Sequence, residues 1–360
     1  MRDNNRSPKP PRAEVWSPST LGPPWPVAAS VIIPSYTLDR WSLLCDAVHS
    51  VQVQTRPPLE IIICVDHNAD LFARCTTEWP PERPSEVPIR IIENRFEQDP
   101  AEAEAHLRAH GSRRRFGAGW ARNCAAELAR GDVLAFLDDD AAAAPAWLAH
   151  LLAPYDEPST IAVGGAPLPR YETERPGWFP PNFDWVFGCA YDGLPSTLAP
   201  AAHLIGANMS VRRTVFEAVG GFHSIDFDDL DLCMRIAAQY PNRTLYYEPL
   251  AVVFHYVPEG RLSWHYFWRR CFFVNREKVE TFAAMGQAAN LNAERAFVRR
   301  ALITQVATQL AALRSGQRVA LLRLGSMVVG IVMAVSGHLV GQAHRLSSRL
   351  FRWRFAGRHV

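Results

Sequence analysis

Short apolar segments that alternate with helical segments constrain the fold of this chain more than any other feature. Residues 29–34 and 59–65 are apolar runs of strand length, and residues 43–53 between them place apolar side chains at helical spacing. A third run at 89–92 precedes an irregular charged segment, and the alternation then returns as an expected helix at 121–129 and a buried strand at 133–137. The pattern predicts an α/β fold, with a mainly parallel sheet that carries helices on both faces.

The chain has 360 residues, which is enough for one large domain with extensions. We expect a flexible proline-rich tail over residues 1–27, an α/β domain over 28–284 and an arginine-rich helical tail over 285–360. Residues 154–200 are rich in proline and aromatic side chains, with a short strand expected only at 161–163. Such a segment predicts an ordered loop region that covers the site and contacts an acceptor.

Acidic residues follow two of the expected strands. Ligands bind at the carboxyl ends of the strands in such sheets, so these positions are candidates for a site. Asp66 can accept hydrogen bonds from a base or a ribose, but a turn-forming Asp-His-Asn cluster explains it equally well. The three carboxylates Asp138, Asp139 and Asp140 repel one another, so they form either a solvated turn or a cation site. Oxygen ligands of this kind suit Mg²⁺ or Mn²⁺.

Two further groups are ambiguous when each is taken alone. Asp228, Asp229 and Asp231 begin an expected helix, a place that capping and the helix dipole favour in any protein. His255 follows the apolar run 251–254, where a histidine more often packs as an ordinary residue than binds a metal. Sugar transfer requires one set of carboxylates for a metal and another carboxylate to accept the acceptor proton. The combination therefore points to chemistry that no single group indicates.

These motifs stand in the order that is characteristic of the family-2 glycosyltransferases, which share the nucleotide-binding GT-A fold. The chain resembles this family over about residues 31–280. The likeness depends on VIIPSY at 31–36, Asp66, the segment 117–140 that ends in DDD, Gly164 with Gly165, GANMSVRR at 206–213, GGF at 220–222, DDLDLCMR at 228–235, and His255. The resemblance implies a GT-A fold with a C-terminal helical, membrane-associated extension.

The resemblance also implies a role for each matching residue. The implied donor and nucleotide pocket consists of Pro34, Ser35, Tyr36, Asp66, Arg122, Asp138 and Asp139. The implied Mg²⁺ or Mn²⁺ ligands are Asp138, Asp140 and His255. Asp229 matches the usual catalytic base, with Asp228 beside it; because common family patterns have Glu-Asp here, either of the two remains a candidate. Trp185 and Asn208 are expected on the acceptor side.

Residues 178–195 and 255–271 resemble a subgroup that includes glucuronosyltransferases acting on glycosylated polyprenyl phosphates. This likeness implies inverting transfer from a nucleotide-diphosphate sugar, with a UDP-sugar as expected donor and a glycan or polyprenyl-phosphate-linked acceptor. The chain departs from the subgroup after Cys271, where FFVNREK replaces a glycine-containing string. The alternative is a non-catalytic nucleotide-sugar-binding or scaffold protein with a basic interaction tail.

The C-terminal tail is purely cationic. No acidic residue follows Glu294, and arginines recur from Arg295 to Arg358, which predicts an anionic partner. Nucleic acid is not expected, because the tail has few aromatic residues and no nucleic-acid-binding motif. The apolar segment 324–340 is short for a span of about 20 residues, so a spanning, an interfacial and a packed terminal helix all remain open. The 7 scattered cysteines suit a reducing compartment, and we expect the cytoplasmic face of the cell membrane.

Overall fold

The computed structural model describes residues 27–80, 87–94, 117–223, 228–284 and 302–356. The predicted N-terminal tail, except for Val27, and part of the basic tail therefore lie outside the described residues. The strands are β1 (Ala29–Ser35), β2 (Glu60–Asp66), β3 (Ile89–Asn94), β4 (Val133–Leu137), β5 (Ala141–Ala143), β6 (Thr160–Tyr171), β7 (Ala199–Pro200), β8 (Asn208–Arg212) and β9 (Thr244–Val257).

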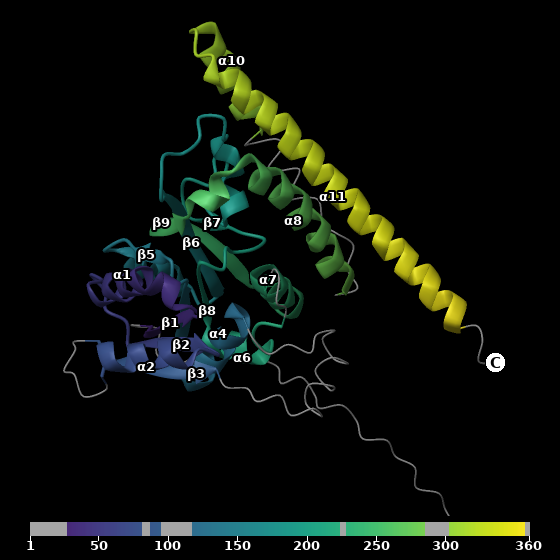
Figure 1. Cartoon of the computed structure of the whole chain (residues 1–360). Helices are drawn as coiled ribbons and strands as arrows, with labels where there is room; N and C mark the ends of the chain where they lie inside the picture. The colour runs from purple at the N-terminus through teal and green to yellow at the C-terminus, as the bar shows by residue number, and fades with distance from the viewer. Residues whose placement is uncertain (1–26, 81–86, 95–116, 224–227, 285–301, 357–360) are drawn as a thin grey trace, which may run out of the picture.

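The helices α1 to α7 cover the two faces of this sheet, and α8, α10 and α11 lie beyond its end (Figure 1). They are α1 (Trp41–Gln52), α2 (Ala69–Glu78), α4 (Ala118–Leu128), α5 (Trp147–Leu152), α6 (Arg213–Ala218), α7 (Asp228–Gln239), α8 (Trp264–Ala284), α10 (Ile303–Arg314) and α11 (Val319–Ala356). Short 3-10 helices occur at η2 (Leu38–Arg40), η3 (Ala153–Asp156), η4 (Pro181–Phe187) and η5 (Glu259–Leu262).

One mixed sheet holds the domain together, and its strand order is β3-β2-β1-β4-β8-β6-β9-β5, with β7 paired to β9. Neighbours from β3 to β4 are parallel, whereas β8 runs antiparallel to both β4 and β6. The predicted α/β class is confirmed; β6 and β9 also pair in parallel, whereas β5 and β7 pair antiparallel with β9. As a result, the carboxyl ends of β1, β2 and β4 meet the start of β8 at one edge of the sheet.

The central strands bury side chains on both faces, which explains their continuous apolar runs. In β1, Val31 and Ile33 face the core beneath α1, α2 and α5, whereas Ile32 faces a second core beneath α4, α6 and α7. In β4, Leu134 and Phe136 join the second core in the same way. The sheet is therefore a fixed layer between two sets of helices.

A third core lies beyond the end of the sheet, where η4, α8 and α11 pack together. Figure 1 shows α11 along the flank of the molecule, with α8 beside it. The contact is very close, because a Cβ added to Gly337 would meet the carbonyl oxygen of Phe272 at 2.0 Å, and one added to Gly330 would meet Phe183 at 2.4 Å. Glycines at this contact let two helix backbones approach as larger residues would not allow.

The structure differs from the sequence expectation in β6, which continues to Tyr171 through Pro167 and Pro169. The strand pairs with β8 only over residues 162–164, and beyond that point it pairs with β9 alone. A proline lacks the backbone N–H that a second neighbour would need, so it is tolerated where one side of a strand is unpaired. The segment predicted as loop is thus partly strand, followed by η4.

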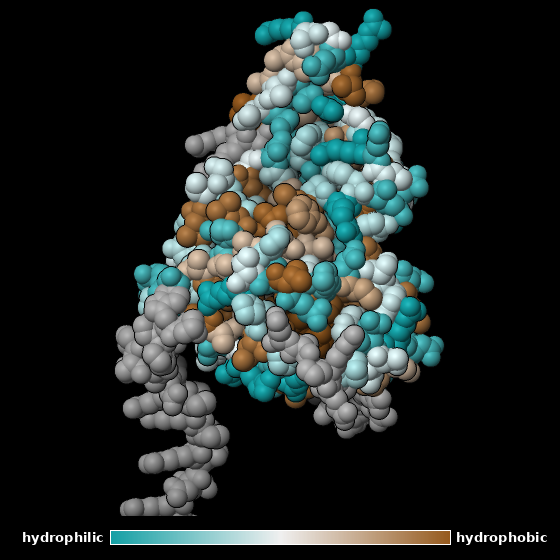
Figure 2. All heavy atoms as spheres, turned by 90° about the vertical axis from the view of Figure 1, so that its left-hand side faces the viewer, coloured by the Kyte–Doolittle hydropathy of each residue, from teal (hydrophilic) through white to brown (hydrophobic). Residues whose placement is uncertain are grey.

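The last helix is also longer than the apolar segment 324–340 suggested. Residues Val319–Leu346 are long and apolar enough to cross a membrane by length and composition. Its side chains include some of the most exposed large hydrophobic residues, among them Leu321, Val328 and Leu339. Figure 2 views the molecule from the left-hand side of Figure 1 and shows apolar residues gathered in the middle of that face among polar ones.

Candidate active site

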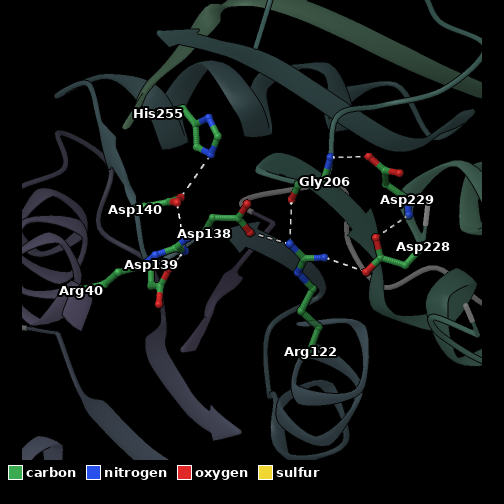
Figure 3. A network of polar contacts seen from close by, with 9 residues as sticks. All are labelled: Arg40, Arg122, Asp138, Asp139, Asp140, Gly206, Asp228, Asp229 and His255. Atoms are coloured by element: carbon green, nitrogen blue, oxygen red, sulfur yellow. Dashed lines mark hydrogen bonds and ion pairs between the residues drawn. The ribbon is translucent and has the colours of Figure 1, made fainter. Parts of the chain in front are cut away.

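The three aspartates after β4 lie in the turn between β4 and β5, at the sheet edge that the fold predicts for ligands (Figure 3). They line one cavity of about 1070 Å³ together with Pro34, Ser35, Tyr36, Asp66, Arg122, Trp185, Asp228, Asp229 and His255. The structure therefore brings together every predicted site residue except Asn208.

Asp138, Asp140 and His255 form a candidate metal centre. Their ligand atoms all lie within 4.8 Å of one another. The sheet explains this convergence, because His255 in β9 pairs with Ala141 in β5, directly after Asp140. Burial raises the pKa of Asp140, but the nearby imidazole of His255 and the charge of Arg40 outweigh that effect and lower it. Burial lowers the pKa of His255, but its contacts with Asp140 and Cys189 outweigh this and raise the pKa to about 10.

The donor atoms fit a divalent cation. Asp140 Oδ1 is buried and accepts no hydrogen bond, although it lies 3.2 Å from Nε2 of His255. Asp138 is the more accessible carboxylate, with 27% of its side chain exposed. Two carboxylates and one imidazole are ligands that Mn²⁺ and related ions accept, and they leave positions for a diphosphate.

Asp139, although adjacent, has a different environment. Its carboxylate accepts hydrogen bonds from Ser35 Oγ at 2.7 Å and from Arg40 at 3.1 Å. Arg40 also lies 3.0 Å from Asp140 Oδ2, so it links the two buried carboxylates. Burial raises the pKa of Asp139 to about 6, against the effects of Ser35 and Arg40. The residue thus fixes the ends of β1 and β4 relative to each other.

Arg122, on α4, connects the metal candidates to the start of α7. Its guanidinium is buried and donates to Asp138 Oδ1 at 2.5 Å and to Asp228 Oδ2 at 2.9 Å (Figure 3). Burial raises the pKa of Asp228 to about 6, although the charge of Arg122 lowers it. By bonding to both carboxylates, the guanidinium of Arg122 holds the end of β4 and the start of α7 in place.

Among the described residues, only backbone N–H groups donate hydrogen bonds to the carboxylate of Asp229. The N–H of Gly206 donates to Oδ2 at 2.9 Å, and the N–H of Leu230 donates to Oδ1 at 2.7 Å. A Cβ at Gly206 would lie 3.3 Å from the Asp229 side chain, so the loop before β8 approaches this carboxylate closely. Each oxygen retains a lone pair, and the side chain faces the cavity.

Asp66 marks the other end of the cavity. Its carboxylate accepts from the N–H of Gly117 and from Asn94 Nδ2, both at 2.7 Å. His67, the next residue, has a positive φ of 50°, which is uncommon for a residue with a side chain. Pro34, Ser35 and Tyr36 line the cavity beside it.

Of the two residues predicted on the acceptor side, one lines the cavity and the other does not. Trp185 lines the cavity from η4. Asn208 does not: it is fully buried, its Oδ1 accepts from Trp147 Nε1, and its Nδ2 donates to the carbonyl of Ala251. The acceptor-side prediction for Asn208 is therefore wrong, because its amide is used within the sheet. Sequence reasoning missed Arg40 and Arg261, which line the cavity; Arg40 lies outside every motif, and Arg261 lies in the segment 255–271 but was not singled out.

A mixed α/β sheet with an Asp-x-Asp pair at the end of a central strand is typical of the GT-A glycosyltransferases. Residues 30–220 match the model of glycosyl transferase family 2, and the chain belongs to this family. The resemblance inferred from the motifs is thereby confirmed.

Similarity to one named relative agrees with this family membership. The chain is 29% identical over 227 residues to the glucosyl-dolichyl phosphate glucuronosyltransferase of Haloferax volcanii, a match that covers 60% of this chain and 66% of the relative. It therefore spans just under two thirds of that relative's length.

Two solved structures are similar to the chain to different extents. The mannosyltransferase PcManGT from Pyrobaculum calidifontis, in complex with GDP-Man and Mn²⁺, is similar with a TM-score of 0.54 and 20% identity, over 91% of this chain and 89% of that one. GalNAc-T7 with UDP, GalNAc and Mn²⁺ matches with a TM-score of 0.47 and 17% identity, over 76% and 54% of the chains. The similarity to PcManGT shows the fold.

Proposed function

We propose that the chain is an inverting glycosyltransferase that moves a sugar from a nucleotide-diphosphate sugar to an acceptor hydroxyl on a polyprenyl-phosphate-linked glycan. The observation that carries this proposal is the shared cavity, in which a candidate metal centre and the carboxylate of Asp229 both face the same space. Family membership and the similarity to a glucuronosyltransferase named for a dolichyl phosphate substrate support it.

The reaction is one in-line displacement. The acceptor oxygen forms a bond to the anomeric carbon while the bond from that carbon to the diphosphate breaks, so the anomeric configuration inverts. Asp229 takes the proton of the acceptor hydroxyl, and the nucleoside diphosphate leaves with the electron pair. A bound divalent cation would supply charge stabilisation for that diphosphate, held by Asp138, Asp140 and His255. The residues of the chain contribute chiefly by positioning and by fixed charges.

Asp229 is the better candidate for the base than Asp228. The carboxylate of Asp228 is committed to a charge-assisted hydrogen bond from Arg122, which occupies its Oδ2. Asp229 makes hydrogen bonds only to backbone N–H groups among the described residues and lines the cavity beside Gly206. We therefore assign Asp228 to positioning and Asp229 to proton transfer.

Mn²⁺ is the proposed cofactor in preference to Mg²⁺. Mg²⁺ favours oxygen ligands in strict octahedral geometry, whereas Mn²⁺ accepts a mixture of carboxylate and imidazole more readily. The presence of His255 in the ligand group is the reason for this choice. A UDP-sugar is the first donor to test.

An interfacial position for α11 fits its packing better than a full span. Its outer face exposes Val328, Val332 and Val335, whereas its inner face packs along α8 through Gly330 and Gly337. A bilayer that surrounded this part of α11 would also immerse α8, which carries the charged residues Arg269, Arg270, Arg276, Glu277 and Lys278. Burying such charges in lipid costs several kcal/mol. The helix therefore contacts lipid on one side, and arginine-rich ends favour an anionic, cytoplasmic surface.

The test is nucleotide release by the purified protein in detergent, across a panel of UDP- and GDP-sugars, with Mn²⁺, Mg²⁺ or EDTA. We expect metal-dependent release from one donor, lost in Asp140→Asn. Asp46→Asn is the matched control, because this carboxylate is 56% exposed and, among the residues that the structure describes, pairs with Arg170 alone. No release from any donor, even with a glycosylated polyprenyl phosphate present, would favour the non-catalytic binding protein.

A further inference from the structure

The cavity does not end at the catalytic carboxylates but continues between α8 and α11. The α8 wall presents Tyr266, Arg270, Val274 and Lys278, which recur every four residues and therefore share one helix face. The opposite wall comes from α11 and consists of Gly330, Ile331, Ala334, Val335, His338 and Leu339. The extension is thus a groove with one cationic and one mainly apolar wall, which we name the α8–α11 groove.

The cationic wall is suited to an anion. The guanidinium of Arg270 makes no hydrogen bond or ion pair with another residue that the structure describes, and none of the described groove residues from α8 or α11 is acidic. Arg261, at the inner end, likewise has no such partner in the described part of the chain, and its charge contributes to lowering the pKa of Asp140. Positive charge without carboxylate partners, in a cavity, is what a phosphate ligand requires.

The apolar wall opens outward. Val335 and Leu339 line the groove and yet are 52% and 62% exposed, so the groove has an apolar mouth on the outer surface of α11. A free phosphate would gain nothing from this wall, whereas a hydrocarbon chain attached to the phosphate would bury against it. The arrangement of anion site and apolar mouth therefore matches a lipid phosphate.

We propose that the α8–α11 groove binds the phosphate and first isoprene units of a lipid-linked acceptor, with Arg270 as the phosphate ligand. This inference rests on the proposed function, since it directs the acceptor sugar from the groove toward Asp229. The phosphate is bound apart from the donor diphosphate, so acceptor binding and donor binding depend on different residues.

Binding tests the groove without any assumption about the transferred sugar. The probes are farnesyl phosphate, farnesol and inorganic phosphate, added to the full chain in detergent and followed by tryptophan fluorescence. We expect farnesyl phosphate to bind at least ~10-fold more tightly than either other probe, because it alone uses both walls, and Arg270→Gln to weaken it ~10-fold. Leu339→Asn should weaken farnesyl phosphate and farnesol by similar factors.

Arg269→Gln is the matched control, because Arg269 is the adjacent residue but lies over the ring of Phe273 at 5.1 Å and outside the cavity lining. Equal effects of Arg269→Gln and Arg270→Gln would overturn the proposal. Inorganic phosphate that binds as tightly as farnesyl phosphate would assign the site to a free anion instead.

Turnover separates this inference from the proposed function. The unmodified protein should slowly hydrolyse the donor in a metal-dependent reaction, with water as acceptor. In Arg270→Gln the KM for a glycosylated polyprenyl phosphate should rise ~10-fold while the donor KM stays constant. An acceptor KM unaffected by Arg270→Gln would refute the groove alone. If the unmodified protein does not hydrolyse any donor, that result would instead refute the proposed function.

Discussion

Replacement of Arg122 by glutamine tests whether the buried cation organises the site. Arg122 makes two charge-assisted hydrogen bonds, to Asp138 and to Asp228, and each such bond contributes about 1.5–3 kcal/mol. The two carboxylates are 27% and 16% exposed, so water compensates part of the loss. We therefore expect Arg122→Gln to lower the free energy of unfolding by about 3 kcal/mol, near the lower limit for breaking a buried ion pair.

The assay is thermal unfolding in detergent, with EDTA and with saturating Mn²⁺. A loss of that size corresponds to a Tm decrease of about 6–12 °C for a domain of this size. With Mn²⁺ the difference from the unmodified protein should shrink, because the ion neutralises Asp138 when Arg122 no longer does. Arg122→Lys should retain part of the stability, since a lysine keeps the charge but cannot form the same bidentate contact.

The control is Arg170→Gln, which removes an exposed ion pair to Asp46 and should change stability by less than about 1 kcal/mol. A Tm decrease in Arg122→Gln no larger than that of the control would refute the reasoning. So would a difference that is equally large with EDTA and with Mn²⁺, because it would mean that Arg122 and the metal act on separate parts of the molecule.

Three further predictions concern regions outside the carboxylate cluster. Burial raises the pKa of Asp184 from 3.8 to about 7, despite the charge of Arg175. The folded protein therefore retains a proton that the unfolded chain releases between these pH values, and the free energy of unfolding should fall as the pH rises from 4 to 7. In denaturation measured at several pH values, Asp184→Asn should flatten that slope. Gly337→Ala places a Cβ 2.0 Å from the Phe272 carbonyl oxygen, so it should loosen α11 from α8, and limited proteolysis should cut α11 sooner; an unchanged cleavage rate would contradict the close packing. Val332 is 55% exposed and lies outside the cavity, so Val332→Asn should reduce flotation with anionic lipid vesicles at unchanged Tm, and undiminished flotation would remove this face from the lipid contact.

The sequence predicted the sheet edge well because buried parallel strands leave a readable pattern. The runs at β1, β2 and β4 are apolar on both faces, and the polar residue after each run marks its end. The position of Asp66 and of Asp138 in the cavity followed directly from this pattern. The extension of β6 through Pro167 was not readable, because it depends on which neighbours pair with that strand.

The features that the sequence did not predict depend on contacts between segments that are distant along the chain. Nothing near Arg40 in the sequence indicates that it links Asp139 and Asp140, and the pairing of Asn208 with Trp147 is equally remote along the chain. The length of α11 was underestimated because the helix continues through the polar residues Arg323 and Gln342, which flank the predicted apolar segment. The glycines Gly330 and Gly337 serve packing at the contact with η4 and α8, which only the three-dimensional structure reveals.

The position of β9 in the sheet has a consequence for the order of folding. This strand is the last in the sequence, but it lies between β6 and β5 rather than at an edge. A nascent chain that has reached residue 240 can pair β1 to β4 and contains Asp138 and Asp140, but β5 lacks the strand it pairs with and His255 has not been made. Insertion of β9 therefore completes the sheet and the metal ligands in a single late event. On nascent chains of increasing length, metal affinity should therefore appear only after β9 has been made, and its appearance would signal that this strand has been inserted.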